Sequence, residues 1–451
     1  MIHKYFLNGY YIVLDVHSGA VHVVDELFYH MLDFLSAPLA SVCPQNIFKE
    51  LPNFQQREIE ETYEEIYELY KAGQLFSEDD YEQFRDMMVS SPIKAMCLHI
   101  AHDCNLRCKY CFASTGDFGA GRRLMPLEVG KKAIDFLIAN SGERHNLELD
   151  FFGGEPLMNF DVVKEVVKYA RSLEKIHNKR FRFTVTTNGM LLDDDKIDFI
   201  NKEMSNVVLS IDGRKEVNDR IRTRVDGSGC YDSILPKFKR LVEKRGHDQY
   251  YVRGTFTKYN LDFAEDVLHF YHEGFDQISI EPVVTDASND YAITEADLPA
   301  VFAEYERLAK IIIEHKKSGK SFNFFHFMID LDQGPCAIKR LRGCGCGNEY
   351  VAVTPDGDIY PCHQFVGMEE WKMGTVDTGI EDKKRKENFA KANIYGKQEC
   401  RDCWAKFYCS GGCNANNFQY AGDILKPYHL ACEMEKKRLE CAIMIKAALA
   451  E

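Results

Sequence analysis

The stretch CNLRCKYC at residues 104–111 places three cysteines in one short loop. Cys104, Cys108 and Cys111 are separated by three and then two residues, a spacing that lets one loop wrap around the corner of a cubic iron–sulfur cluster. A four-iron cluster normally takes four thiolates, so one iron would be left without a protein ligand. The alternatives are a zinc loop or a cluster completed by a distant cysteine.

The loop lies within an alternating pattern of strands and helices, directly after the first strand. Six candidate strands occupy residues 95–100, 147–152, 181–187, 206–211, 251–257 and 277–283. The apolar helical segments between them are 127–140, 162–176, 193–204, 231–245 and 262–274. Repeated strand–helix units predict parallel strands joined by right-handed crossovers, here an α/β fold with an open or partial (β/α)6 barrel. Chemistry in such folds lies at the carboxyl ends of the strands, where the cysteine loop falls.

Length and composition restrict the class of protein. A chain of 451 residues is long enough for two or three domains. The formal charge of −14 argues against a sequence-independent nucleic-acid partner, and no apolar run is long enough to cross a membrane. Sixteen cysteines without an export signal favour metal ligation in a reducing cytosol over disulfides. We therefore expect a cytoplasmic protein that binds metal.

Residues 1–85 are expected to form a separate small unit. Two short strands around Gly19 are predicted in 10–24, followed by a helix with Asp25 as its N-cap. A second helix in 55–73 has apolar residues at intervals of three and four. Strands followed by short helices predict a winged helix-turn-helix. A DNA-binding role is disfavoured because the segment 58–70 is too acidic to lie against phosphate.

Short motifs recur where the later candidate strands end. They are FFGGEP at 151–156, TTNG at 186–189, SIDG at 210–213, NDRIR at 218–222 and SIEP at 279–282. Taken singly, each could be an ordinary turn, because glycine, Asp and Asn are common in turns. Five motifs in this order, together with the cysteine loop, resemble the radical S-adenosylmethionine (SAM) enzymes.

This resemblance implies that residues 92–320 form a radical SAM barrel. Cys104, Cys108 and Cys111 would hold a [4Fe–4S] cluster whose open iron binds the methionine part of SAM, and one electron would then release a 5′-deoxyadenosyl radical. Contacts to SAM are implied for Tyr110, Gly153, Gly154, Glu155, Asn188, Ser210, Asp212, Arg222 and Glu281. Glu155 is expected at the amino group of SAM and Arg222 at the carboxylate, for which a guanidinium fork is suited.

The last third of the chain carries a second cysteine pattern. Cys344 is followed by Gly357 and Cys362, and then by C-x2-C-x5-C-x3-C and a final cysteine. The pattern resembles the SPASM domain, here residues 321–451, which holds two auxiliary clusters and brings the total to three [4Fe–4S] clusters. The resemblance assigns a distal cluster to Cys400, Cys403, Cys409 and Cys432, and a proximal cluster to Cys344, Cys362 and Cys413. A zinc ribbon is the alternative.

The proximal cluster has only three assigned ligands. Cys336 or Cys346 could supply a fourth, but Cys346 lies only two residues from Cys344, and Cys336 needs a suitable loop. We favour a second open iron, and a complete cluster is its main rival.

The N-terminal unit resembles the peptide-recognition element of ribosomal peptide maturation enzymes, which pairs a leader peptide with an exposed strand edge. The stretches 8–26 and 349–367 are similar to maturases of the six-cysteine peptides called SCIFF, which form sulfur-to-carbon thioether crosslinks (ranthipeptides). The resemblance implies a cysteine-rich precursor peptide bound through its leader, a low-potential electron donor such as flavodoxin or ferredoxin, and an anaerobic organism.

Two other functions compete with thioether formation. The first is that of the anaerobic sulfatase-maturating enzymes, which oxidise Ser or Cys to formylglycine. That group is expected to have an Asp as base after the cysteine at the Cys362 position, where this chain has His363, another possible base. The second is a non-catalytic iron–sulfur redox sensor with a winged DNA-binding domain, which would not need the motifs at Glu155 and Arg222.

Overall fold

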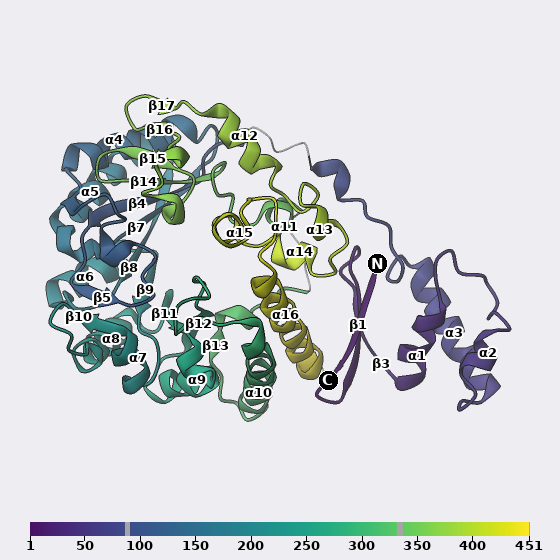
Figure 1. The fold of residues 1–451 in the computed structure, drawn as a ribbon. Helices are drawn as coiled ribbons and strands as arrows, with labels where there is room; N and C mark the ends of the chain where they lie inside the picture. Colours follow the sequence, from purple (N-terminus) through teal and green to yellow (C-terminus); the bar gives the residue numbers. More distant parts are fainter. Residues whose placement is uncertain (86–90, 332–336, 451) are drawn as a thin grey trace.

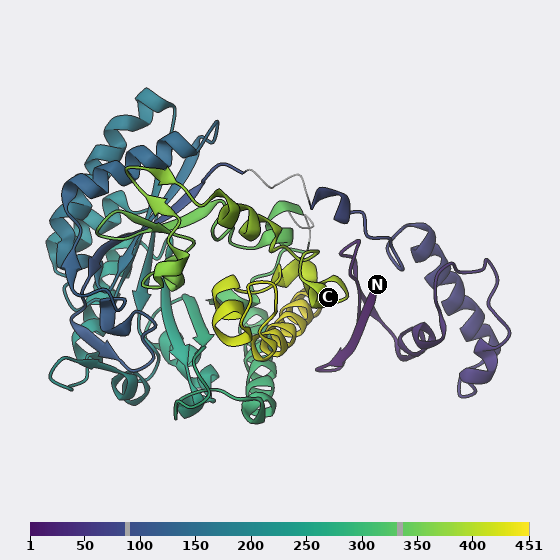
Figure 2. The same cartoon turned by 45° about the horizontal axis from the view of Figure 1, so that its top comes forward.

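The computed structural model describes residues 1–85, 91–331 and 337–450. Three parts follow one another across the molecule in Figures 1 and 2. The strand–helix barrel lies at one side and the N-terminal unit at the other, with most of the cysteine-rich C-terminal segment between them. No helix among the described residues is long and apolar enough to cross a bilayer.

Six strands of the barrel are parallel and adjacent in sequence order, as the alternating pattern predicts. They are β4 (Ala95–His102), β7 (Asn146–Gly153), β8 (Arg180–Thr187), β9 (Asn206–Ser210), β11 (Tyr250–Phe256) and β12 (Gln277–Pro282). The helices that connect them are α4 (Leu127–Asn140), α5 (Phe160–His177), α6 (Asp194–Glu203), α7 (Lys215–Ile221), α8 (Tyr231–Arg245) and α9 (Phe263–His272). Their apolar faces and the inner strand residues form one continuous core.

The sheet is wider than the six predicted strands. β14 (Tyr350–Val353), from the cysteine-rich segment, is parallel to β4, and β13 (Asn323–Phe324) is parallel to β12. A short antiparallel series continues from β14 through β15 (Asp358–Tyr360), β16 (Gly374–Thr375) and β17 (Gly379–Ile380). The C-terminal segment is therefore joined to the barrel by backbone hydrogen bonds.

The N-terminal unit has one more strand than expected. β1 (Ile2–Leu7), β2 (Tyr10–Asp15) and β3 (Val21–Val24) form an antiparallel sheet in that order. The predicted N-cap is present, because the backbone N–H of Phe28 donates to Asp25 at 2.8 Å. The helices are α1 (Glu26–Met31), α2 (Ile47–Glu50) and α3 (Gln56–Lys71). The winged helix-turn-helix stays a prediction.

The C-terminal helix connects the parts. α16 (His429–Ala450) packs along α10 (Leu298–Lys317) and also contacts β1 and β2. The short helices around the cysteines are α11 (Ala337–Arg342), α12 (Lys383–Lys391), α13 (Gln398–Arg401), α14 (Lys406–Cys409) and α15 (Asn414–Ala421). Among the described residues, the N-terminal unit thus rests mainly on the C-terminal segment.

A tight turn follows β8 at the edge where the motifs gather. Gly189 has φ +78° and packs beneath Phe238 of α8, so that a Cβ at this position would lie 2.2 Å from the ring. Gly246 ends α8 with a similar φ of +67° but has open space where its Cβ would be. Alanine at position 246 would therefore meet only the strain of the left-handed backbone, whereas alanine at position 189 would also clash with Phe238.

We predict that Gly189→Ala destabilises the protein more than Gly246→Ala. Both substitutions cost about 1–2 kcal/mol for the left-handed backbone, and overpacking against Phe238 should add about 1–3 kcal/mol. The free energy of unfolding in urea measures the difference. Equal decreases in the free energy of unfolding for the two variants would contradict the prediction and show that Phe238 and α8 can move to accommodate the extra methyl group.

Candidate functional site

A cavity of about 130 Å³ lies at the carboxyl ends of the barrel strands. The predicted residues that line it are Cys104, Cys108, Tyr110, Cys111, Gly153, Gly154, Glu155, Asn188, Ser210 and Arg222. They come from the loop after β4 and from the ends of β7, β8 and β9, with Arg222 at the start of β10 (Arg222–Arg224). The fold therefore brings together residues that are far apart in the chain.

The cysteine loop is held by backbone pairing. β5 (Leu106–Cys108) pairs antiparallel with β10, and Cys108 lies opposite Arg222 in that register. The Cys104 sulfur accepts the N–H of Leu106 at 3.4 Å. Burial raises the pKa of Cys104 to about 11 and that of Cys108 to about 12. A metal bound here must therefore displace thiol protons, so binding should weaken as the pH falls.

The two glycines of the FFGGEP motif make room for this loop. A Cβ on Gly153 would lie 2.2 Å from the carbonyl oxygen of Ala101, and one on Gly154 would lie 2.1 Å from that of Asp103. The sequence suggested that the glycines allow a ligand to approach the backbone. The first group they admit is the protein's own backbone just before Cys104.

Glu155 ties two strand ends together. Its carboxylate accepts the Thr187 hydroxyl at 2.8 Å and the backbone N–H of Asn188 at 2.8 Å. It also accepts the N–H of Leu157 at 3.0 Å. Asn188 in turn donates to Asn105, inside the cysteine loop, at 2.8 Å. These bonds fix the edge of the cavity before any ligand is bound.

A buried ionic network forms another wall. Tyr110 donates to both carboxylate oxygens of Asp212 at 2.8 and 2.9 Å, and Arg222 donates to the Tyr110 oxygen at 2.7 Å. Arg222 is 7% exposed, and its Nε has no hydrogen-bond partner within the described residues. Such a donor suits an anionic ligand, as the predicted contact with the SAM carboxylate requires. Asp212 itself lies behind Tyr110 and does not line the cavity.

Glu281 does not line this cavity. It forms an ion pair with Arg253 at 2.6 Å and borders a separate cavity of about 350 Å³ beside His326 and Arg438. Cys409, Cys413 and Cys432 also border that second cavity. The structure therefore separates Glu281 from the other predicted SAM contacts.

The four cysteines assigned to the distal cluster all line a third cavity. Its volume is about 260 Å³, and its walls include Cys400, Cys403, Cys409 and Cys432. Four thiolates are the donor set of a closed four-iron cluster. Across the described part of the chain, no three His, Cys, Asp or Glu side chains are close enough to hold a single metal ion.

The proximal cysteines gather around Cys362. The charges of Cys344 and Cys362 both act on the thiol of Cys413, whose pKa burial raises to about 11. Cys346 is 5% exposed, and its thiol donates to the carbonyl of Pro361 at 3.5 Å, close enough to Cys362 for the two thiols to shift each other's pKa. Cys336 lies outside the described residues.

Comparison with known proteins agrees with this geometry. Residues 98–270 match the radical SAM superfamily, and residues 344–404 match the SPASM iron–sulfur cluster-binding domain. The chain carries a radical SAM domain and a SPASM domain. The thiol donor sets and the unpaired Arg222 nitrogen fit the SAM and [4Fe–4S] groups that these domains imply.

Relatives include several maturation enzymes. A cysteine-type anaerobic sulfatase-maturating enzyme of Clostridium novyi is 23% identical over 335 residues, covering 70% of this chain and 86% of the relative. The radical SAM cyclopropyl synthase TigE of Paramaledivibacter caminithermalis is 20% identical over 459 residues, covering 95% of this chain and 91% of the relative. The structure of anSMEcpe with bound AdoMet and a Kp18Cys peptide has a TM-score of 0.64 at 19% identity, covering 80% of this chain and all of that one.

Lys397 is a SPASM-domain residue that the sequence analysis missed. Its side chain is fully buried, and its ammonium donates to the Gly411 carbonyl at 2.6 Å and to Asn414 at 2.8 Å. No carboxylate of the described residues forms an ion pair with it. Burial lowers its pKa, and cysteines from both auxiliary sets oppose that shift: Cys344, Cys400, Cys409 and Cys413. No motif would have revealed this lysine, because its role depends on burial.

We predict that Lys397→Met lowers the iron held by the SPASM domain. The substitution keeps the side-chain length but removes both hydrogen bonds across the turn between Cys409 and Cys413, at a cost of about 1–3 kcal/mol. Iron content per chain and the free energy of unfolding are the measurements. Lys426→Met is the control, because Lys426 is exposed in the same domain. Equal iron content per chain in the two variants would refute this role of Lys397.

Proposed function

We propose that this protein is a peptide maturase that forms sulfur-to-carbon thioether crosslinks in a cysteine-rich ribosomal peptide. The observation that carries the proposal is the cavity where three cysteines face Arg222 at the carboxyl ends of the barrel strands. The SPASM domain beside it, and relatives that include sulfatase-maturating enzymes and a cyclopropyl synthase, support action on a peptide.

Each wall of the first cavity has a proposed role. Cys104, Cys108 and Cys111 hold the cluster, and the free Nε of Arg222 receives the SAM carboxylate. Tyr110 keeps that guanidinium in place through a hydrogen bond, and the Asp212 carboxylate compensates its charge. Glu155 shapes the side of the cavity toward the SAM amino group. When bound, cluster and SAM supply a one-electron cleavage that yields a 5′-deoxyadenosyl radical.

The proximal cysteines would lie nearest the reacting sulfur. We assign Cys344, Cys362 and Cys413 as ligands, and two groups compete for the remaining position. One is a thiolate of the substrate. The other is a cysteine of the chain, either Cys336 or Cys346, of which Cys346 lies close enough to Cys362 for the two thiols to shift each other's pKa.

His363 bears on the choice between thioether and formylglycine. Its ring lies 5.4 Å from that of Phe112 and 5.2 Å from that of Phe152, and both phenylalanines line the first cavity. Burial lowers the pKa of His363 to about 4, so the imidazole is neutral at pH 7 but is a weak base there. An Asp base is absent from this position, which favours thioether formation over sulfatase maturation.

The free edge of the N-terminal sheet is the proposed leader site. Within the described residues, β3 pairs with β2 alone, so its other edge is available for another strand. Val23 on this strand is 45% exposed. Backbone pairing along β3 would bind a leader with little dependence on its side chains, and neighbouring pockets would set the register.

We predict that replacing Cys104, Cys108 and Cys111 by Ala abolishes reductive SAM cleavage but leaves iron in the SPASM domain. Deoxyadenosine release and iron content are the measurements, made on anaerobically reconstituted full-length protein.

With a cysteine-rich precursor, the intact enzyme should give a product that loses hydrogen but keeps all its sulfur. A product aldehyde that has lost sulfur would favour formylglycine formation instead. Undiminished deoxyadenosine release by the protein with the three Ala substitutions would refute the cluster assignment.

We predict that Val23→Pro weakens precursor binding and spares SAM cleavage without substrate. Proline removes a backbone donor from β3 and disfavours strand pairing. Val23→Thr is the matched control, because it keeps both the N–H and the β-branched shape. Titration of a labelled full-length precursor gives the dissociation constants. Leader docking elsewhere is indicated if the two variants bind the precursor equally well.

A further inference from the structure

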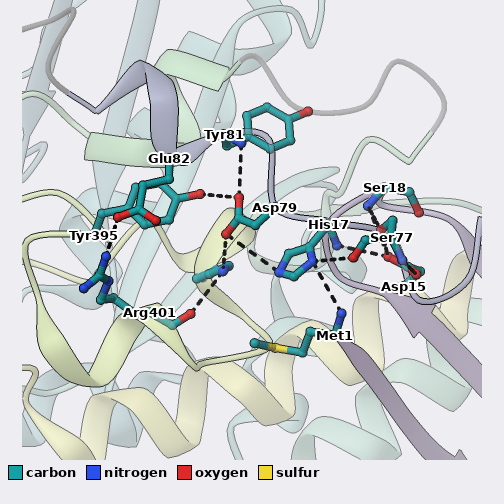
Figure 3. Close-up of polar contacts among 11 residues, drawn as sticks. Met1, Asp15, His17, Ser18, Ser77, Asp79, Tyr81, Glu82, Tyr395 and Arg401 are labelled. Atoms are coloured by element: carbon teal, nitrogen blue, oxygen red, sulfur yellow. Dashed lines mark hydrogen bonds and ion pairs between the residues drawn. The ribbon is translucent and has the colours of Figure 1, made fainter. Parts of the chain in front are cut away.

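The N-terminal unit is fastened to the distal-cluster loop by residues 77–82, which follow α3. Figure 3 shows this junction, with Asp79 between His17 of the N-terminal unit and Tyr395 and Arg401 of the SPASM domain. Asp79 accepts the Tyr395 hydroxyl at 2.6 Å, and its other oxygen lies 3.7 Å from His17. One carboxylate therefore touches both parts.

Its strongest charged partner is Lys406. The Lys406 ammonium donates to Asp79 at 2.7 Å, and the lysine side chain is only 3% exposed. The same ammonium donates to the carbonyl of Arg401 at 3.0 Å. Removing the anion from such a pair leaves an uncompensated buried charge, which costs far more than an exposed ion pair contributes.

Lys406 belongs to the wall of the distal-cluster cavity, which it shares with four cysteines. It lies between Cys403 and Cys409, and its backbone N–H donates to the carbonyl of Cys403 at 3.2 Å. The Arg401 carbonyl that it also binds lies between Cys400 and Cys403. A displaced Lys406 would therefore disturb the loop on both sides of Cys403.

Two further contacts connect the N-terminal unit to the same loop. Arg401 forms an ion pair with Glu82. The ring of Trp404 stacks on that of His3 in β1, with centroids 3.7 Å apart and planes 2° from parallel. The loop from Cys400 to Cys409 is thus covered on this side by the N-terminal unit.

We propose that Asp79 is a positioning residue for the distal auxiliary cluster, acting from the N-terminal unit through the buried ammonium of Lys406. The proposal rests on the proposed function in that it takes Cys400, Cys403, Cys409 and Cys432 as cluster ligands. It means that the unit proposed to bind the leader also sets the geometry and the local charge of the outermost cluster.

Charge gives this role a signature that simple loss of structure would not produce. Reduction potentials of iron–sulfur clusters depend on nearby charge and hydrogen bonding. Asp79→Asn removes a negative charge, so the distal potential should rise. Lys406→Met removes a positive charge, so the potential should fall. The double variant removes both charges and should return close to the unsubstituted value.

The experiment uses the full chain with Cys104, Cys108 and Cys111 replaced by Ala, so that only auxiliary clusters contribute. Potentials and iron content are measured by redox titration with electron paramagnetic resonance, and the distal signal is the one lost in Cys403→Ala. Asp80→Asn is the matched control, because it makes the same charge change at the exposed neighbouring position. If Asp79→Asn proves insoluble, the double variant decides, since it holds no unpaired buried charge.

Opposite shifts in the single variants, recovery in the double variant and no shift in Asp80→Asn support the proposal. Loss of distal iron in Asp79→Asn, restored in the double variant, supports it as well. Equal potentials and full iron in every variant would overturn it and leave the proposed function standing. If the chain without these substitutions holds no cluster at the four distal cysteines, the proposed function itself fails.

Discussion

The bonds made by the buried carboxylate of Glu155 are the constraint on which the site depends. They join the ends of β7 and β8, and through Asn188 they reach the cysteine loop after β4. The glycines before Glu155 allow this contact because the loop backbone fills the space of their missing side chains. Three strand ends are thereby held in register, and the other cavity residues take their positions from those strands.

The barrel could be predicted from the sequence because its signals are local. Each of the six strands carries its own apolar pattern, and all but β11 end at the cysteine loop or at a polar motif. The parallel order follows from the connections between them. The strands that were missed lack such signals. β13 has only two residues, and β14 joins the sheet beside β4 although it lies about 250 positions later in the chain.

The candidate site was predictable to the same degree. The motif residues meet at one edge because parallel strands bring their carboxyl ends together, whereas the side chain of Glu281 lines the second cavity. Lys397 and Lys406 could not be identified from the sequence, because lysines are common and nothing local indicates burial. The partner of Lys406 lies 327 positions away, a contact that only the folded chain defines.

Three buried cations beside the cysteine-lined cavities have their charges compensated in two different ways. Arg222 and Lys406 each have a carboxylate of the chain beside them, so their charges are compensated before any cofactor binds. Among the described residues, Lys397 has only carbonyl and amide oxygens and the thiols of both proposed auxiliary sets around it. Thiols that become thiolates on binding iron supply the missing negative charge. If these cysteines hold the auxiliary clusters as proposed, we expect folding of the SPASM domain around Lys397 to be coupled to cluster insertion, whereas the first cavity and the Asp79 junction would form without it.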